Sequence, residues 1–195
     1  MSHHIYHTRG FILASQAIGE SNRFYKIFTE ELGLVGASAQ SVREGKSKLR
    51  YTLHDLSFVT VDLVRGKEVW RIISAGAWRP LEKIKTDTRK LKLLVQYCSF
   101  LSRFIHGERR DTELSNEIKR VADFLEAETI PQNLILSFET MTILRTLVHL
   151  GYIDPKGHQR FLGDEGYSLE ALSRFERVRQ ATLPLISNAL DASHL

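Results

Sequence analysis

The chain has 195 residues, of which 43% are apolar, with one cysteine (Cys98) and a net charge of +4. This composition is sufficient for a buried core in one domain or two small ones, while the single cysteine excludes both an internal disulfide and a zinc module built on cysteine pairs. Because it contains neither a run of about 18 apolar residues nor the cationic and apolar start of a secretory signal, we expect a cytoplasmic protein, bound to no membrane, that carries no metal or other cofactor.

Short strands separated by glycines are predicted up to about residue 78. Apolar or alternating segments occupy residues 10–15, 23–29, 33–42, 54–64 and 68–78. Five short strands favour a small closed barrel, because closure removes exposed strand edges. We expect a five-stranded OB-like β-barrel over residues 1–80, with an SH3-like barrel as the alternative.

The pattern changes to a helical period after residue 80. Apolar residues at helical spacing predict four helices, over about residues 87–106, 112–126, 131–150 and 168–190. Pro184 is expected to kink or break the last helix and to leave a short final piece. The predicted fold is therefore α+β, with the barrel followed by an all-α helical domain over residues 81–195. The expected helix caps are Thr86 or Asp87, Asp111 or Thr112, and Ser168.

The excess positive charge belongs to the first 80 residues. They contain 11 lysines and arginines against 7 acidic residues, whereas residues 81–195 contain 16 of each. Residues 43–50, Arg-Glu-Gly-Lys-Ser-Lys-Leu-Arg, hold four of these cations between two predicted strands. Lysine and arginine release the counterions condensed on phosphates, so this segment is typical of a nucleic-acid interface. The alternative is a solvated charged loop.

Aromatic residues near this segment are candidates for stacking on bases. Tyr51 follows the cations directly and is the preferred candidate. Phe24 and Tyr25 alternate along a predicted strand, so they lie on opposite faces of it. We expect Phe24 to belong to the core and leave Tyr25 open between the core and base stacking.

Several segments resemble the RecO family, the bacterial recombination mediators. Residues 19–21 (Gly-Glu-Ser), 28–33 (Phe-Thr-Glu-Glu-Leu-Gly) and 39–43 (Ala-Gln-Ser-Val-Arg) follow the order of the N-terminal OB domain of RecO. Residues 138–145 running into Leu150-Gly151-Tyr152 look like the central helix of that family. The resemblance covers most of residues 5–155. It departs from the family at Gln40, where a lysine is usual, and in lacking the zinc module found in many members.

The resemblance implies a non-enzymatic protein of recombinational DNA repair. RecO proteins bind single- and double-stranded DNA, anneal complementary strands, and engage RecR and the single-strand-binding protein so that the recombinase is loaded. The sequence has no Walker loop and no GxGxxG, HExxH or GxSxG motif, so we expect no catalysis. The alternatives are a protein-interaction adaptor and an RNA-binding OB module.

The expected DNA-binding residues are cations of the barrel half and one aromatic residue. They contact the phosphate backbone or stack on bases, and they do not read base edges. The set is Arg43, Lys46, Lys48 and Arg50, extended by Arg9, Arg23 and Lys26, with Tyr51 for stacking.

Three further arginines are expected to bind a partner protein. Arg109 and Arg110 lie between two predicted helices, and Arg145 lies on the third helix. The expected ligand is the acidic C-terminal tail of the single-strand-binding protein, which needs an apolar groove flanked by cations. The alternative is that these arginines complement helix dipoles.

Overall fold

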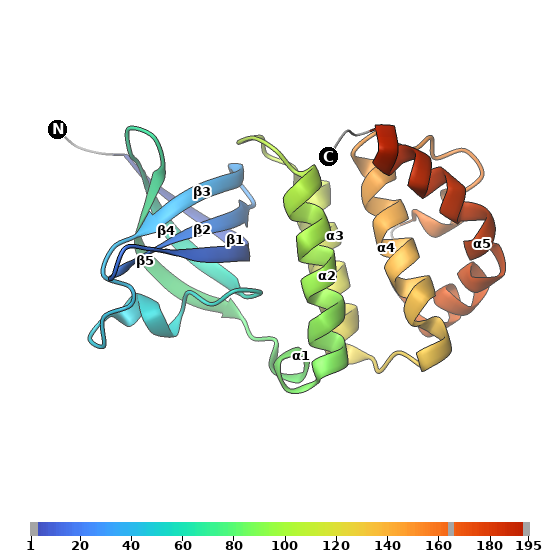
Figure 1. The fold of residues 1–195 in the computed structure, drawn as a ribbon, viewed down its shortest axis with the longest axis horizontal. Coiled ribbons are helices and arrows are strands. Elements are labelled where there is room, and N and C mark those ends of the chain that lie inside the picture. Colours follow the sequence, from blue (N-terminus) through green and yellow to red (C-terminus); the bar gives the residue numbers. More distant parts are fainter. Residues whose placement is uncertain (1–3, 164–165, 193–195) are drawn as a thin grey trace. The chain divides into compact units, whose positions relative to one another are not determined.

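The computed structural model describes residues 4–163 and 166–192 (Figure 1). The chain forms two compact units. The first contains the residues up to Leu81 together with Leu101–Ser115, and the second contains Glu82–Phe100 and the residues from Asn116 onward. The expected domain boundary at residue 80 stays a prediction. Residues 101–115 lie beyond this boundary in the sequence, but they pack with the N-terminal unit.

Five strands form a closed barrel in the order β1-β2-β3-β5-β4. Neighbouring strands are antiparallel except β3 and β5, whose short parallel pairing places Ala37 opposite Trp70. This closed five-stranded barrel confirms the predicted OB-like fold. The strands are β1 (Ile5–Ile18), β2 (Asn22–Thr29), β3 (Gly33–Ala39), β4 (Phe58–Arg65) and β5 (Trp70–Arg79).

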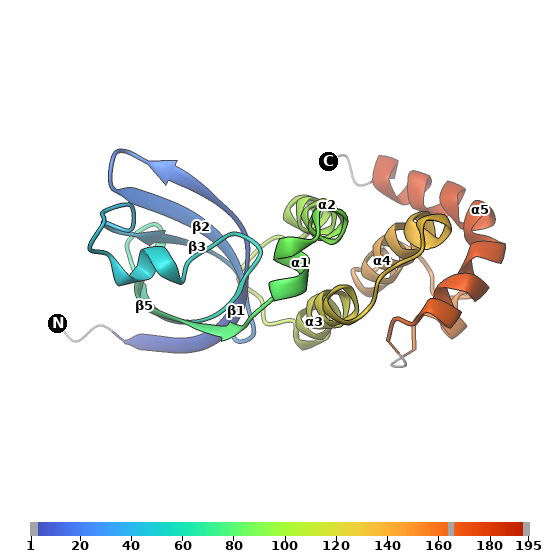
Figure 2. The ribbon, with the colours of Figure 1, turned by 90° about the horizontal axis from the view of Figure 1, so that it is seen from below.

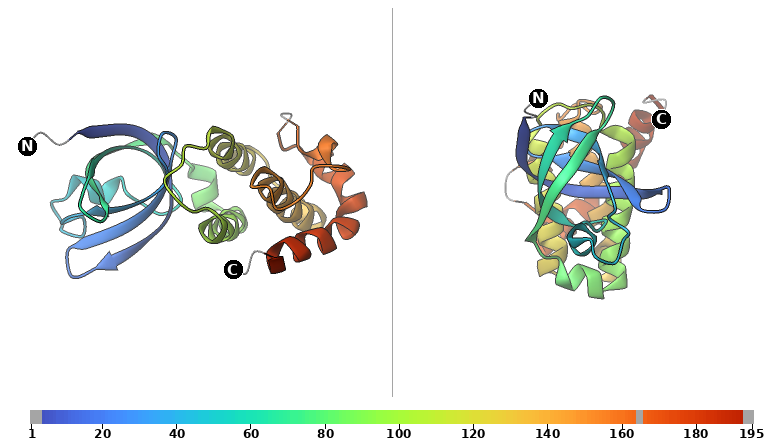
Figure 3. Two further views of the ribbon diagram at one scale, coloured as in Figure 1. Left: turned by 90° about the horizontal axis from the view of Figure 1, so that it is seen from above. Right: turned by 90° about the vertical axis from the view of Figure 1, so that its left-hand side faces the viewer.

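β1 is longer than predicted because it pairs with two neighbours. Its first half pairs with β4 and its second half with β2, and the register shifts between Ile12 and Ala14. Such a bulge bends a strand, and Figure 3 shows β1 curving along the barrel wall. Gly10 lies where the two pairings overlap. A Cβ atom there would come within 2.8 Å of the Ile27 side chain, so the close approach of the strands requires glycine.

The interior of the barrel is filled from one face of each strand. In β2 that face carries Tyr25 and Ile27, both fully buried. Phe24 lies on the opposite face, half-buried, with its ring against Gly36 of β3. The expectation that Phe24 is the core residue of the pair is therefore wrong. Alternation alone could not decide between the two faces, because each of them carries aromatic and apolar residues.

The rest of the chain is helical. The side chains of Asp87, Asp111 and Ser168 each accept a hydrogen bond from a backbone N–H in the first turn of a helix, which confirms these predicted caps. Within residues 4–163 and 166–192, none of the helices combines the length and apolar character needed to cross a membrane. The helices are α1 (Glu82–Thr86), α2 (Thr88–Phe104), α3 (Thr112–Ala127), α4 (Ile135–His149) and α5 (Leu169–Ala192).

α5 continues through Pro184. The helix is unbroken from Leu169 to Ala192, so the predicted short final piece does not exist as a separate element. Figure 1 shows the helix bending along its length. A bend accommodates a proline ring, which lacks the N–H donor and crowds the preceding turn.

A buried ion pair joins α3 to α4 in the helical unit. Arg145 Nε lies 2.8 Å from a carboxylate oxygen of Glu117, and the two side chains are 5% and 6% exposed. Arg120 and the hydroxyl of Tyr167 also donate hydrogen bonds to this carboxylate. Burial by itself raises the pKa of Glu117, but the bonds and charge of Arg145, with the two other donors, outweigh it and hold the pKa below its usual value.

We predict that Glu117→Gln lowers the free energy of unfolding by about 3–5 kcal/mol, because the buried Arg145 loses its carboxylate partner. Since the pKa of Glu117 is lowered in the folded state, its contribution is present above the unfolded-state pKa and is lost as the pH falls through the folded-state pKa. Urea unfolding should show this decline below about pH 4.5 in the wild type and a weaker decline in the variant.

The matched control is Glu170→Gln, which removes a carboxylate that is 82% exposed on α5. This change should alter the free energy of unfolding by less than about 0.5 kcal/mol. Equal pH dependence in the wild type and Glu117→Gln would contradict the assignment.

Candidate nucleic-acid interface

The predicted cationic segment is part of a structured connection between β3 and β4, residues 40–57. It includes a short 3-10 helix, η1 (Lys48–Tyr51), and Figure 2 shows it in cyan at one end of the barrel. Val42 and Leu53 are buried in the apolar core of the barrel, and Leu49 packs against it. The cations of the connection are all exposed: Arg43, Lys46, Lys48 and Arg50.

Hydrogen bonds to the barrel fix both ends of this connection. The backbone N–H of Arg43 donates to the carbonyl of Ser21 at 3.0 Å, and that of Leu56 donates to the carbonyl of Ile12 at 2.9 Å. Ser41 and Leu56 have φ angles of 52° and 59°, a region that costs free energy for residues other than glycine. The backbone hydrogen bonds tie both ends of the connection to the barrel, which distinguishes it from an unstructured charged loop.

A pocket of about 730 Å³ lies between this connection, β1 and β2. We call it the barrel-end pocket. Arg23 of β2 and Arg43 and Arg50 of the connection line it, with Asp55 as the acidic residue of the lining. The guanidinium of Arg23 donates to the hydroxyl of Ser15 at 2.7 Å, and that of Arg43 donates to a backbone carbonyl at 2.9 Å. Neither acceptor carries a charge, so the pocket presents net positive charge to a ligand.

The barrel-end pocket brings together four of the eight expected DNA-binding residues. Lys46 and Lys48 are exposed on the same connection and are not among the lining residues. The four that line the pocket are Arg23, Arg43, Arg50 and Tyr51.

The two remaining cations lie on the barrel wall. Lys26 is on the opposite face of β2 from Arg23, because side chains alternate along a strand. The Arg9 guanidinium lies over the ring of Trp78, 4.6 Å from its centroid. Both side chains are exposed, and their contact with DNA stays a prediction.

Arg109 and Arg110 lie in the segment between α2 and α3 that packs with the barrel. In this segment Glu108 accepts a hydrogen bond from the indole N–H of Trp70 at 3.0 Å. Arg110 faces the carboxylate of Glu31 at 3.4 Å, in an exposed ion pair. Both arginines are exposed, and their role as partner contacts stays a prediction.

Arg145 is 6% exposed, and its role as a partner contact stays a prediction. Its Nε and one terminal nitrogen bind Glu117. The other terminal nitrogen donates to the carbonyl oxygens of Phe161, at 3.0 Å, and Gly163, at 3.3 Å. These bonds to the two carbonyl oxygens position the segment that follows α4.

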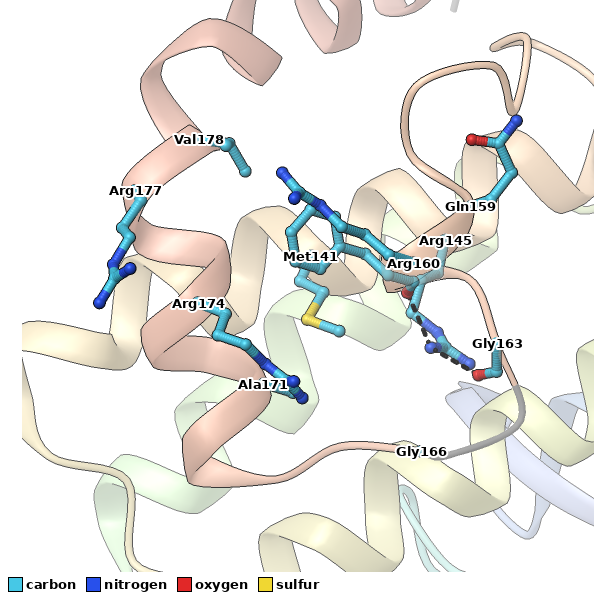
Figure 4. Close-up of a pocket in the computed structure, with 11 residues that line it drawn as sticks. Met141, Arg145, Gln159, Arg160, Gly163, Gly166, Ala171, Arg174, Arg177 and Val178 are labelled. Atoms are coloured by element: carbon cyan, nitrogen blue, oxygen red, sulfur yellow. Dashed lines mark hydrogen bonds between the residues drawn. The ribbon is translucent and has the colours of Figure 1, made fainter.

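A second pocket, of about 590 Å³, lies in the helical unit between α4, α5 and the loop that contains the short helix η3 (Gln159–Phe161). We call it the helical pocket (Figure 4). Met141 and Val178 contribute apolar atoms to it, and Arg160 and Arg174 extend toward it from opposite sides. Sequence reasoning missed these arginines, because Arg160 lies in a segment without periodic pattern. The helical spacing of α5 was the one available signal for Arg174.

Within the described residues, no group of three histidine, cysteine, aspartate or glutamate side chains is arranged to hold a metal ion. Arginines, aromatic residues and apolar side chains line both pockets.

Comparison with known proteins shows what the barrel is similar to. Residues 1–79 match the family model described as "Recombination protein O N terminal". The barrel is therefore similar to the N-terminal part of RecO proteins. All residues that line the barrel-end pocket fall within the part that matches the RecO model.

Three relatives named "DNA repair protein RecO" extend the similarity beyond the barrel. The protein of Clostridium perfringens strain 13 is 26% identical over 144 residues, which are 73% of this chain and 57% of the relative. That of Dehalococcoides mccartyi strain CBDB1 is 25% identical over 136 residues, 70% and 54% of the two chains. That of Rubrobacter xylanophilus is 27% identical over 122 residues, 63% and 49%. The chain spans about half the length of these RecO relatives.

We predict that Leu53→Ala loosens the cationic connection without changing its charge. Loss of this buried side chain should lower the free energy of unfolding by about 2–4 kcal/mol. Amide hydrogens of residues 43–52 should then exchange faster than in the wild type, because the connection opens more readily. The control is Leu136→Ala, at a side chain that is 55% exposed, and unchanged exchange in Leu53→Ala would contradict the anchoring role.

Proposed function

We propose that this chain is a RecO-like, non-enzymatic DNA-binding protein of recombinational DNA repair, and that the barrel end binds the DNA backbone. The name of the three relatives supports the role in repair. The main support for this interface is the set of exposed cations on the structured β3–β4 connection, which borders a pocket lined by three arginines. The net positive charge of the whole chain also resides in this half of the molecule.

The proposed activity is the annealing of single strands and help in loading the recombinase onto them. Annealing needs phosphate charge to be neutralised while base edges stay available for pairing. Exposed lysines on a fixed connection meet this requirement, because they contact phosphates and leave the bases free. An RNA-binding module could use the same contacts, and it would prefer structured RNA to single-stranded DNA of equal length.

We predict that the triple variant Lys46→Ala/Lys48→Ala/Arg50→Ala binds single-stranded DNA more weakly and with a shallower salt dependence. Each phosphate contact on a single strand contributes about 0.7 to the slope of log affinity against log salt concentration, so the slope should fall by about two units. Fluorescence anisotropy over a series of salt concentrations measures both quantities.

The matched control for this experiment removes the same charge from the helical unit. Lys83→Ala/Lys85→Ala/Arg89→Ala changes three exposed cations at α1 and the start of α2. This variant should keep the wild-type affinity and slope. If the two triple variants behave alike, the effect is one of net charge and the assignment of the interface to the barrel end fails.

We further propose that the helical pocket receives the acidic C-terminal tail of the single-strand-binding protein. Such a tail needs an apolar groove flanked by cations, and the pocket supplies both. The guanidinium of Arg174 lies 3.9 Å from the exposed Glu170, a long and weak pairing that leaves its charge available. RecR is proposed as another partner on the basis of the similarity to RecO.

We predict that Arg160→Ala/Arg174→Ala weakens binding of a synthetic acidic tail peptide by about tenfold or more, because two charge-assisted contacts are lost. Fluorescence anisotropy with a labelled peptide, in the absence of DNA, gives the affinity. The comparison variant is Arg109→Ala/Arg110→Ala, which removes two other exposed arginines. Loss of binding in that variant alone would place the contact on the segment between α2 and α3.

A further inference from the structure

The floor of the barrel-end pocket contains a hydroxyl without a partner. The ring of Tyr25 is fully buried in the barrel core, and the residue lines the pocket. Its hydroxyl oxygen is buried, and no described residue offers it a hydrogen bond. A buried hydroxyl without a partner is unfavourable, and a ligand that supplies one removes this cost.

The Tyr25 hydroxyl is uncharged, which suits it to hydrogen bonding with a ligand. Burial raises the pKa of the Tyr25 phenol, although the nearby Arg23 acts in the opposite direction. The group therefore keeps its proton and can both donate and accept a hydrogen bond. Asp55, on the lining of the same pocket, can only accept when ionised.

The lining of the pocket offers three kinds of contact. Arg23, Arg43 and Arg50 suit a phosphate group, which binds guanidinium groups through paired hydrogen bonds. Tyr51, 73% exposed on the adjoining turn, suits the face of a base. The Tyr25 hydroxyl suits a ligand group that is flat and largely apolar and that carries hydrogen-bonding atoms. Such a group packs on the side chains that close the barrel. A phosphate ion would use the first kind of contact alone.

We propose that the barrel-end pocket receives one unstacked nucleotide of a single strand, with its phosphate on the arginines, its base against Tyr51 and its base edge at the Tyr25 hydroxyl. This inference rests on the proposed function of the barrel end and deepens it. A pocket of about 730 Å³ is within the size range of small-ligand sites. A base leaves its neighbours at least cost in a single strand, so the pocket discriminates single-stranded from duplex DNA.

The test separates contacts to the base from contacts to phosphate. Tyr25→Phe removes the hydroxyl and keeps the ring. It should lower the affinity for a thymidine single strand about fivefold, the effect of one net hydrogen bond. Affinity for a duplex, and the salt slope on both ligands, should not change, because no charge is removed. The thermal midpoint of the free protein should stay the same or rise, because an unpartnered buried hydroxyl is lost.

Tyr51→Ala provides a second variant at an exposed position, where folding is not at risk. It should lower single-strand affinity about tenfold through loss of stacking, again without a change in salt slope. A strand in which abasic sites replace the bases keeps every phosphate. Wild-type protein should bind this abasic strand more weakly than the thymidine strand, and both variants should lose most of that difference.

The outcomes distinguish this inference from the proposed function. Wild-type affinity of Tyr25→Phe and Tyr51→Ala for the thymidine strand, or an equal loss on the abasic strand, overturns the nucleotide pocket and leaves backbone binding standing. Absence of salt-dependent DNA binding by the wild type overturns the proposed function, and the nucleotide pocket with it. A loss confined to the thymidine strand supports the pocket.

Discussion

Burial of apolar side chains at one end of the barrel places the four cations of the β3–β4 connection at the surface. Val42 and Leu53 enter the core and Leu49 packs against it, so the polar residues between them are forced outward. Backbone hydrogen bonds tie both ends of the connection to the barrel and restrict its movement. A cationic segment fixed in this way loses less entropy on binding than a flexible loop does, because its ordering precedes the ligand.

The helical unit uses charge in the opposite manner. Arg145 and Glu117 are buried together, and they form hydrogen bonds with each other and with neighbouring groups. The pair fixes α3, α4 and the following loop, and it supplies no free charge to a ligand. Arg160 and Arg174, at the edge of the helical pocket, keep their exposed charge. The environment of an arginine thus distinguishes a buried, fully hydrogen-bonded side chain from exposed ones at the same pocket.

The sequence predicts the elements of this fold that depend on local chemistry. These elements depend on signals that act within a few residues, so they can be recognised without knowledge of tertiary contacts. The signals are alternation, helical spacing and the caps at Asp87, Asp111 and Ser168. The same holds for the exposed cations of the connection, which stand out by charge. This part of the candidate site was within reach of the sequence.

The features that were missed depend on long-range packing. The inward face of β2, which buries Tyr25 and exposes part of Phe24, is fixed by the neighbouring strands. The burial of Arg145 requires Glu117, which lies on another helix. The placement of Arg160 beside α5 requires the fold of the loop after α4. Each of these depends on the partner across the interface, which sequence spacing does not identify.

The double pairing of β1 has a consequence for synthesis of the chain. Its first half meets β4 about fifty residues later, with Gly10 opposite Val59, and the ring closes when β5 reaches β3. Such distant pairings are slow to form, because a long loop must be closed first. A nascent chain that has not yet extended past Arg79 therefore emerges from the ribosome with an open sheet whose edges other polypeptides can join, a hazard that ends only when the fifth strand arrives.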